Sequence, residues 1–286
     1  MLLRPQLAKI PSRGSLFRNS IAKTSHSISV ARKAGDEVSN IFRHQNRALA
    51  YVRTPGSSPG VVFLGGFRSD MEGTKARCLE LWAKREGRAF LRFDYSGHGA
   101  SSGEFSELGI GDWAADTAAI ISGLTEGPQI LVGSSMGGWI SLLLARARPE
   151  GVLGLVTIAA APDFTEDKLW AGFDESQKST LEAKGVVEVP SAYDETPYPI
   201  SRTLIEQGRQ NLVLQKPLSL PFTVRILHGT NDTDVDISVA YRLLDHAKCE
   251  DMRLIAVKGA DHRFSDPECL KLIIQTIEEV IARNDQ

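Results

Sequence analysis

Short apolar runs alternate with longer amphipathic stretches from about residue 41 to the end of the chain. Four of the apolar runs have the length of buried strands: Val61–Leu64, Ala89–Phe93, Gln129–Gly133 and Val152–Ala159. Three stretches between them carry apolar residues at helical spacing: Asp70–Glu86, Gly111–Leu124 and Met136–Arg148. Because strands that alternate with helices form βαβ units, the pattern predicts an α/β fold with a mostly parallel central sheet and helices on both faces.

Elements of the same kind are predicted at both ends of this region. A hairpin is expected where Ile41–His44 and Ala48–Arg53 flank Asn46-Arg47. Two more strands and two more helices follow residue 221: Thr223–Leu227, Ser238–His246, Arg253–Val257 and Pro267–Arg283. The sequence therefore predicts one α/β domain over residues 36–286.

The alternation breaks between residues 162 and 221. Prolines recur there, beside several acidic residues and only short helical patches: Pro190, Pro197, Pro199, Pro217 and Pro221. We expect this stretch to be a small cap-like insertion rather than a layer of the core.

The first 35 residues differ from the rest in charge. Seven of them are lysine or arginine, serine is frequent, and no acidic residue occurs before Asp36. This composition is typical of an organelle transit peptide, although a disordered basic tail would share it. We exclude residues 1–35 from the fold and expect a distinctly acidic mature protein in the mitochondrial matrix.

Overall composition excludes several classes of protein. The net charge of −2 argues against a dedicated nucleic-acid binder, which normally carries a strongly basic face. No run reaches the roughly 18 apolar residues that a transmembrane helix needs. The cysteines Cys78, Cys249 and Cys269 are scattered and odd in number, which fits neither a disulfide framework nor a zinc site. Neither a cofactor nor a metal ion is expected.

One motif predicts a catalytic nucleophile. Gly133-Ser134-Ser135-Met136-Gly137 follows a predicted strand and precedes a predicted helix, which is the G-x-S-x-G turn in its expected context. Glycine two positions to either side lets the strained turn approach its neighbours, and the helix directs its amides at the site. Ser135 is therefore the predicted nucleophile, with Ser134 as the neighbouring alternative.

A serine hydroxyl needs a histidine base, which a carboxylate in turn orients. In this type of fold the chain order is Ser, then Asp or Glu, then His. His262 lies between the last predicted strand and the last predicted helix, where the base is required. The other histidines precede the serine or suit structural positions at a turn or a helix end: His26, His44, His98, His228 and His246.

The acid is expected in the loop after the strand Thr223–Leu227. Asp232 stands there, 30 residues before His262, and is the preferred candidate. Asp234 competes with it, whereas Asp236 is better placed to cap the next helix.

Two backbone amides are expected to stabilise the oxyanion of acyl transfer. The first donor is predicted to be Met136, which follows the nucleophile. The second is predicted to be Phe67, with Gly66 as an alternative, in the glycine-rich loop after Val61–Leu64. The side chains of Met136 and Phe67 are expected to wall the acyl pocket.

Several longer runs carry a family resemblance: Phe63–Phe67, Arg92–Gly97, Gly127–Trp139, His228-Gly229 with Asp232, and Asp261–Arg263. On these runs the chain resembles the mitochondrial palmitoyl-protein thioesterases of the α/β-hydrolase domain family, also described as mycophenolic acid acyl-glucuronide esterases. The resemblance extends from about residue 47 to the end and implies the α/β-hydrolase fold. It also implies the roles of nucleophile, acid and base for Ser135, Asp232 and His262.

The resemblance further implies S-acylated proteins, or small acyl esters such as acyl glucuronides, as substrates hydrolysed through an acyl-Ser135 intermediate. Two other functions stay open on the sequence. The chain could be a general carboxylesterase of small esters, or a non-catalytic binding protein with the same fold.

Overall fold

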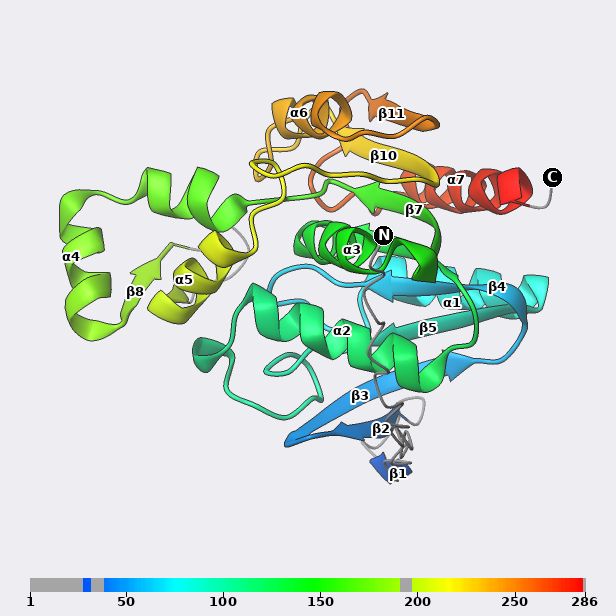
Figure 1. Ribbon diagram of the computed structural model, residues 1–286, viewed down its shortest axis with the longest axis horizontal. Helices are drawn as coiled ribbons and strands as arrows, with labels where there is room; N and C mark the ends of the chain where they lie inside the picture. Colours follow the sequence, from blue (N-terminus) through cyan, green and yellow to red (C-terminus); the bar gives the residue numbers. More distant parts are fainter. Residues whose placement is uncertain (1–27, 32–38, 191–196, 285–286) are drawn as a thin grey trace, which may run out of the picture.

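A computed structural model describes residues 28–31, 39–190 and 197–284 (Figure 1). In these residues nine strands form one sheet in the order β1-β2-β3-β5-β4-β6-β7-β10-β11. The strands are β1 (Ile28–Ala31), β2 (Ser39–His44), β3 (Arg47–Thr54), β4 (Ser57–Leu64), β5 (Arg88–Phe93), β6 (Gln129–Ser134), β7 (Val152–Ile158), β10 (Thr223–Gly229) and β11 (Met252–Val257). From β5 to β11 in sheet order all neighbours pair parallel, whereas the β1-β2-β3-β5 edge is antiparallel. The predicted, mostly parallel sheet is confirmed.

Helices cover both faces of the sheet and enclose two core layers. On one face α1 (Thr74–Glu86) and α7 (Pro267–Asn284) contact each other and the strands. On the other face lie α2 (Ile110–Leu124), α3 (Met136–Ala147) and α6 (Ser238–His246). Side chains of a strand alternate between the faces, so Phe63 of β4 joins the first layer and Leu64 the second.

The spacing of buried residues along α7 explains why this segment is a helix on the sheet. Its inward positions recur every three or four residues, which places them on one face: Cys269, Ile273, Ile277, Val280 and Ile281. Complete burial of each such aliphatic side chain contributes roughly 1.5–3 kcal/mol. The amphipathic pattern read from the sequence is thus the contact surface of the helix.

Helix α1 starts four residues later than its apolar spacing predicts. Residues Asp70–Gly73 form a turn, in which the Met71 amide donates a hydrogen bond of 2.6 Å to the buried carboxylate of Asp94. The helix begins at Thr74 and ends at Gly87, whose φ of 63° suits glycine. This long-range hydrogen bond, which periodicity cannot reveal, anchors the turn that precedes the helix.

Between β7 and β10 the chain leaves the sheet and forms a separate lobe, at the left of Figure 1. Its elements are a π-helical segment (Thr165–Trp170), α4 (Glu175–Lys184), β8 (Val186–Val189), β9 (Tyr198–Ser201) and α5 (Arg202–Gln210). Strands β8 and β9 pair antiparallel, and α5 packs against α2. The stretch is more regular than its prolines suggest: Pro190 and Pro197 fall just outside the strands, and Pro199 lies within β9, a strand that pairs only with β8 among the described residues.

Most of the predicted leader, residues 1–35, lies outside the described residues. Its described part is β1, which pairs antiparallel with β2 at the sheet edge and which the sequence interpretation did not include. Among the helices that the structure describes, none has the length and hydropathy of a membrane span.

Candidate active site

Ser135 occupies a sharp turn between β6 and α3. Its φ of 55° and ψ of −119° are unfavourable for a residue with a Cβ, so the surrounding structure must hold them. The Ser135 amide donates to the carbonyl of Ile158 at 2.9 Å. Its carbonyl accepts from the amides of Gly138 and Ala161, at 2.9 and 3.1 Å. These three bonds fix the serine at the carboxyl end of β6.

Both glycines of the motif are sterically required. A Cβ on Gly133 would lie 2.4 Å from the carbonyl oxygen of Gly137. A Cβ on Gly137 would lie 2.1 Å from the carbonyl oxygen of Leu64, in the neighbouring strand. The turn closes only because neither position carries a side chain.

Asp232, His262 and Ser135 form one hydrogen-bonded chain. The Nδ1 atom of His262 lies 2.8 Å from Oδ2 of Asp232, and Nε2 lies 3.1 Å from Oγ of Ser135. With the proton on Nδ1, this imidazole donates to the carboxylate and presents Nε2 as an acceptor for the serine hydroxyl. The loops after β6, β10 and β11 supply the three residues, since the carboxyl ends of parallel strands meet at one sheet edge.

The carboxylate of Asp232 is held in its ionised form. Burial raises the pKa of this fully buried side chain, but hydrogen bonds outweigh that effect and leave the pKa below its ordinary value. His262 donates one of these bonds, and the amides of Asp234 and Val235 donate two more to Oδ1, at 2.9 and 2.8 Å. An anion is therefore in place to stabilise a protonated His262.

His228 supports the acid loop from beneath. The ring is fully buried, and its Nε2 lies 2.9 Å from the carbonyl oxygen of Val235 and 3.4 Å from Oδ2 of Asp232. As the donor to the carbonyl of Val235, His228 holds the loop that carries Asp232. The sequence assigned His228 only a structural role at a turn; the short spacing to Asp232 was the signal for this contact.

The competing aspartates occupy other positions. Asp234 lines the cavity beside the site, while it is Asp232 that bonds His262. Asp236 accepts the amide of Ser238, the first residue of α6, at 2.8 Å. This contact agrees with its expected capping role.

Asp232, Asp234 and His262 have ligand atoms within 4.8 Å of one another, as metal ligands would. Two of the three are, however, hydrogen-bonded to each other, and His262 also bonds Ser135. The cluster thus has the hydrogen bonds that an acid–base pair beside a nucleophile requires.

The loop after β4 passes close to Ser135, as an oxyanion loop should. A Cβ on Gly66 would lie 3.4 Å from the Cβ of Ser135. Met136 begins α3 on the other side of the serine, and Phe67 lines the cavity. The side chain of Met136 is fully buried in the core and does not line the cavity. The expectation that Met136 walls the acyl pocket is therefore wrong.

A cavity of about 410 Å³ opens above Ser135, and Ser134 also lines it. Phe67 anchors its apolar wall through edge-to-face contacts with four aromatic rings: Phe105, Trp113, Phe164 and Tyr198. Three cationic side chains, Arg68, Lys75 and Arg263, share the lining with Asp70 and Asp234. The site thus combines an apolar wall with a charged rim.

Lys75 and Arg68 were not recognised from the sequence. Burial lowers the pKa of Lys75 to about 8, although the nearby Asp261 carboxylate opposes that shift. The ammonium donates to the carbonyl of Arg263 and lies 3.4 Å from Oγ of Ser265. On the amphipathic pattern alone, Lys75 belongs to the solvent face of α1.

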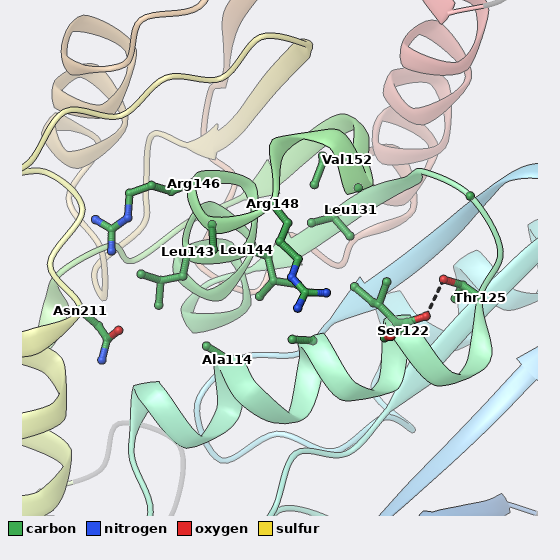
Figure 2. Close-up of a pocket in the computed structure, with 15 residues that line it drawn as sticks. Ala114, Ser122, Thr125, Leu131, Leu143, Leu144, Arg146, Arg148, Val152 and Asn211 are labelled. Carbon is green, nitrogen blue, oxygen red and sulfur yellow. Dashed lines mark hydrogen bonds between the residues drawn. The ribbon is translucent and has the colours of Figure 1, made fainter. Parts of the chain in front are cut away.

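A second cavity, of about 370 Å³, lies between α2 and α3. Figure 2 shows Leu143, Leu144 and Arg148 facing Ala114 and Ser122 of α2 across it. None of Ser135, Asp232 and His262 lines this cavity, whereas Ser135 and His262 line the first one, which is therefore the candidate active site.

Residues 61–268 match the family model described as alpha/beta hydrolase family. The chain belongs to the α/β-hydrolase family. The fold and the enzyme class expected from the sequence are thereby confirmed, and this protein is a hydrolase.

Curated relatives of this α/β hydrolase include proteins named palmitoyl-protein thioesterase ABHD10, mitochondrial. The one from Bos taurus is 39% identical over 237 residues, which cover 82% of this chain and 76% of the relative. The one from Homo sapiens is 38% identical over 234 residues, with the same coverage of 82% and 76%.

Among solved structures, the alpha/beta hydrolase domain-containing protein 10 from mouse matches with a TM-score of 0.76 and 34% identity, over 90% of this chain and 99% of that one. A putative hydrolase from Agrobacterium vitis S4 matches with a TM-score of 0.79 and 34% identity, over 90% and 98%. The resemblance stated from the motifs is thus confirmed over most of the chain.

Proposed function

We propose that this protein is a serine hydrolase of acyl thioesters, which removes S-palmitoyl and similar acyl groups from protein cysteines. The observation that carries the proposal is the continuous hydrogen-bonded chain from Asp232 through His262 to the hydroxyl of Ser135 beside a cavity. The palmitoyl-protein thioesterase name of the mitochondrial relatives supports the choice of a thioester substrate.

The first half-reaction acylates the serine. Oγ of Ser135 attacks the thioester carbonyl while Nε2 of His262 takes the hydroxyl proton. Negative charge develops on the carbonyl oxygen, and the amides of Met136 and Phe67 stabilise it. The C–S bond then breaks, and His262 gives its proton to the departing cysteine sulfur.

The second half-reaction releases the acid. His262 removes a proton from a water molecule, which attacks the carbonyl of acyl-Ser135. The ester bond to Oγ breaks, and the proton returns to Ser135. Activated esters such as acyl glucuronides follow the same path, with a sugar oxygen as the leaving atom.

The remaining expectations fit this activity. Residues 1–35 have the composition of a transit peptide, and the relatives are named mitochondrial, so we place the enzyme in the mitochondrial matrix. The lobe within residues 162–221 supplies Tyr198 to the cavity and acts as the cap that shapes substrate choice.

Labelling with a fluorophosphonate probe tests the nucleophile. Wild type and Ser134→Ala, the matched neighbour, should both label, and Ser135→Ala should not. Labelling of Ser135→Ala would refute the assignment of the nucleophile, whereas an unlabelled wild type would favour the non-catalytic binding protein.

Substrate preference needs a second assay. The purified protein is compared on palmitoyl-thioester probes and on short nitrophenyl esters. Palmitoyl-thioester turnover well above background is expected. A background rate on the thioester with rapid turnover of the short esters would instead identify a general carboxylesterase.

A further inference from the structure

Arg68 is held in place at the rim of the Ser135 cavity by its backbone and by its side chain. Its φ of 55° is unusual for a residue with a Cβ, and its amide donates to Nε2 of His98 at 3.3 Å. The guanidinium carbon lies 5.4 Å from the ring centroid of Phe105 and 5.0 Å from that of Tyr198. Cation–π contacts at these distances restrict the guanidinium of Arg68 to a position beside the two rings.

His98 is suited to hold this backbone. The ring is buried, and burial lowers its pKa, so it stays neutral near pH 7. Nδ1 lies 3.2 Å from the carbonyl oxygen of Ser96 and donates to it, which leaves Nε2 free to accept from Arg68. The contact fixes Arg68 next to Phe67, the proposed oxyanion donor.

The guanidinium edge remains available. Among the described residues, no carboxylate lies within ion-pair distance of Arg68, and the residue is exposed on the cavity side of the loop. Asp70, two residues along the chain, does not pair with Arg68; its carboxylate accepts a hydrogen bond from the amide of Glu72 at 3.0 Å. Lys75 and Arg263 add positive charge to the same lining, against Asp70 and Asp234. The rim is therefore a favourable place for an anion.

We propose that Arg68 binds an anionic group of the substrate, a carboxylate or a phosphate, beside the scissile carbonyl. The planar fork of N–H donors matches both groups in geometry, and the two rings hold this exposed guanidinium at the cavity that also contains Ser135. The inference rests on the proposed hydrolase function and narrows its substrates. It selects esters and thioesters whose leaving group carries negative charge over neutral ones of equal acyl chain.

Matched substrates that differ by charge test the proposal. An acyl glucuronide is compared with the acyl glucuronamide, in which a neutral amide replaces the sugar carboxylate. For phosphate, an acyl-4′-phosphopantetheine is compared with the pantetheine thioester of the same acid. The pair that shows the larger effect identifies the anion.

The variant Arg68→Gln should raise KM for the charged member of a pair about tenfold, the effect of one partly exposed charge-assisted contact. Any loss in kcat/KM for the neutral member should be clearly smaller than for the charged member, because a disturbance of the loop beside Phe67 would affect both substrates equally. Arg68→Lys keeps the positive charge but loses the planar fork of donors, so its KM for the charged substrate should lie between those of wild type and Arg68→Gln. Arg85→Gln removes an exposed arginine from the far end of α1 and is the matched control.

Equal losses on charged and neutral substrates, or none on either, would overturn the proposal while leaving the hydrolase function intact. If the protein turns over none of these substrates, the affinity of the free leaving groups for Ser135→Ala is measured instead by titration, which does not require catalysis. Glucuronate or 4′-phosphopantetheine should bind Ser135→Ala more tightly than glucuronamide or pantetheine, and adding Arg68→Gln to this variant should remove the difference. Equal binding of the charged and neutral probes would also overturn the proposal.

Discussion

Replacing Asp232 by asparagine exchanges one oxygen for an NH2 in a side chain that accepts from His262 and from the amides of Asp234 and Val235. Because Oδ1 receives both amides, the asparagine oxygen is expected to stay there. The NH2 group would then face Nδ1 of His262. That ring would place its proton on Nε2, which can no longer accept the hydroxyl proton of Ser135.

A reversed tautomer removes general-base catalysis but leaves the oxyanion amides and the binding site. The expected loss in kcat is about 10³- to 10⁴-fold, which corresponds to about 4–5.5 kcal/mol of transition-state stabilisation. KM should change little, because Asp232 is fully buried and does not line the cavity.

The same variant has a signature in stability. The folded-state pKa of Asp232 lies below its ordinary value, so its ionisation stabilises the fold above the unfolded pKa. That contribution disappears as the pH falls through the folded pKa. Asp232→Asn should therefore unfold more readily near pH 7 but show a shallower loss of stability on acidification.

Steady-state hydrolysis of a nitrophenyl ester, together with the rate of fluorophosphonate labelling, measures the effect. Asp234→Asn is the matched comparison, because Asp234 keeps its amide bond to Asp232 and should lose less than about tenfold in kcat. A loss for Asp234→Asn equal to or larger than that for Asp232→Asn would refute the assignment of the acid. A pH–rate profile checks that each variant is compared at its optimum.

Three further predictions concern the turn, the cavity amine and the core. Gly137→Ala should lower the melting temperature strongly, because its Cβ would lie 2.1 Å from a carbonyl oxygen of β4; wild-type melting would contradict that contact. Lys75, with its pKa lowered to about 8 chiefly by burial, should be about half neutral at pH 8. In peptide mapping after brief acylation at pH 8, Lys75 should be modified faster than exposed lysines, which are still protonated. Near pH 11 this advantage should disappear, because the exposed lysines are then largely neutral too. Equal rates of modification at pH 8 would refute the lowered pKa. Glu80→Ala removes the buried partner of Arg92, 2.7 Å away, while Glu72 and the carbonyl of Met71 still contact the guanidinium, so urea unfolding should show a loss of about 1–3 kcal/mol; a loss as small as that of the surface control Glu86→Ala would argue against it.

Local sequence patterns were sufficient for the sheet apart from its edge strand β1, for the main helices and for the turn at Ser135. The buried face of α7 is visible in the sequence as a helical repeat. The glycines on either side of Ser135 indicate that the backbone lies too close to its neighbours for a side chain to fit there. His262 could be placed because a parallel sheet brings the ends of successive strands to one edge. Each of these inferences depends only on residues that are near one another in the chain, or on fold-wide geometry.

The lobe between β7 and β10 shows where local patterns fail. Its prolines indicated an irregular insertion, yet the structure has α4, α5 and a small antiparallel sheet there. Packing of α5 against α2 supports this lobe, and such contacts between distant segments leave no periodic signal in the sequence.

The sequence by itself determined the fold class, the predicted nucleophile and the predicted base, because periodicity, glycine sterics and strand order are properties of the chain. The sequence preferred Asp232 but left Asp234 open, and the tertiary structure shows that Asp232 contacts His262, since the loop folds so that the amides of Asp234 and Val235 bond the Asp232 carboxylate. The tertiary structure also brought Arg68 against rings from the segment after β5 and from the cap. Contacts between residues this far apart in the chain exist only once the chain has folded.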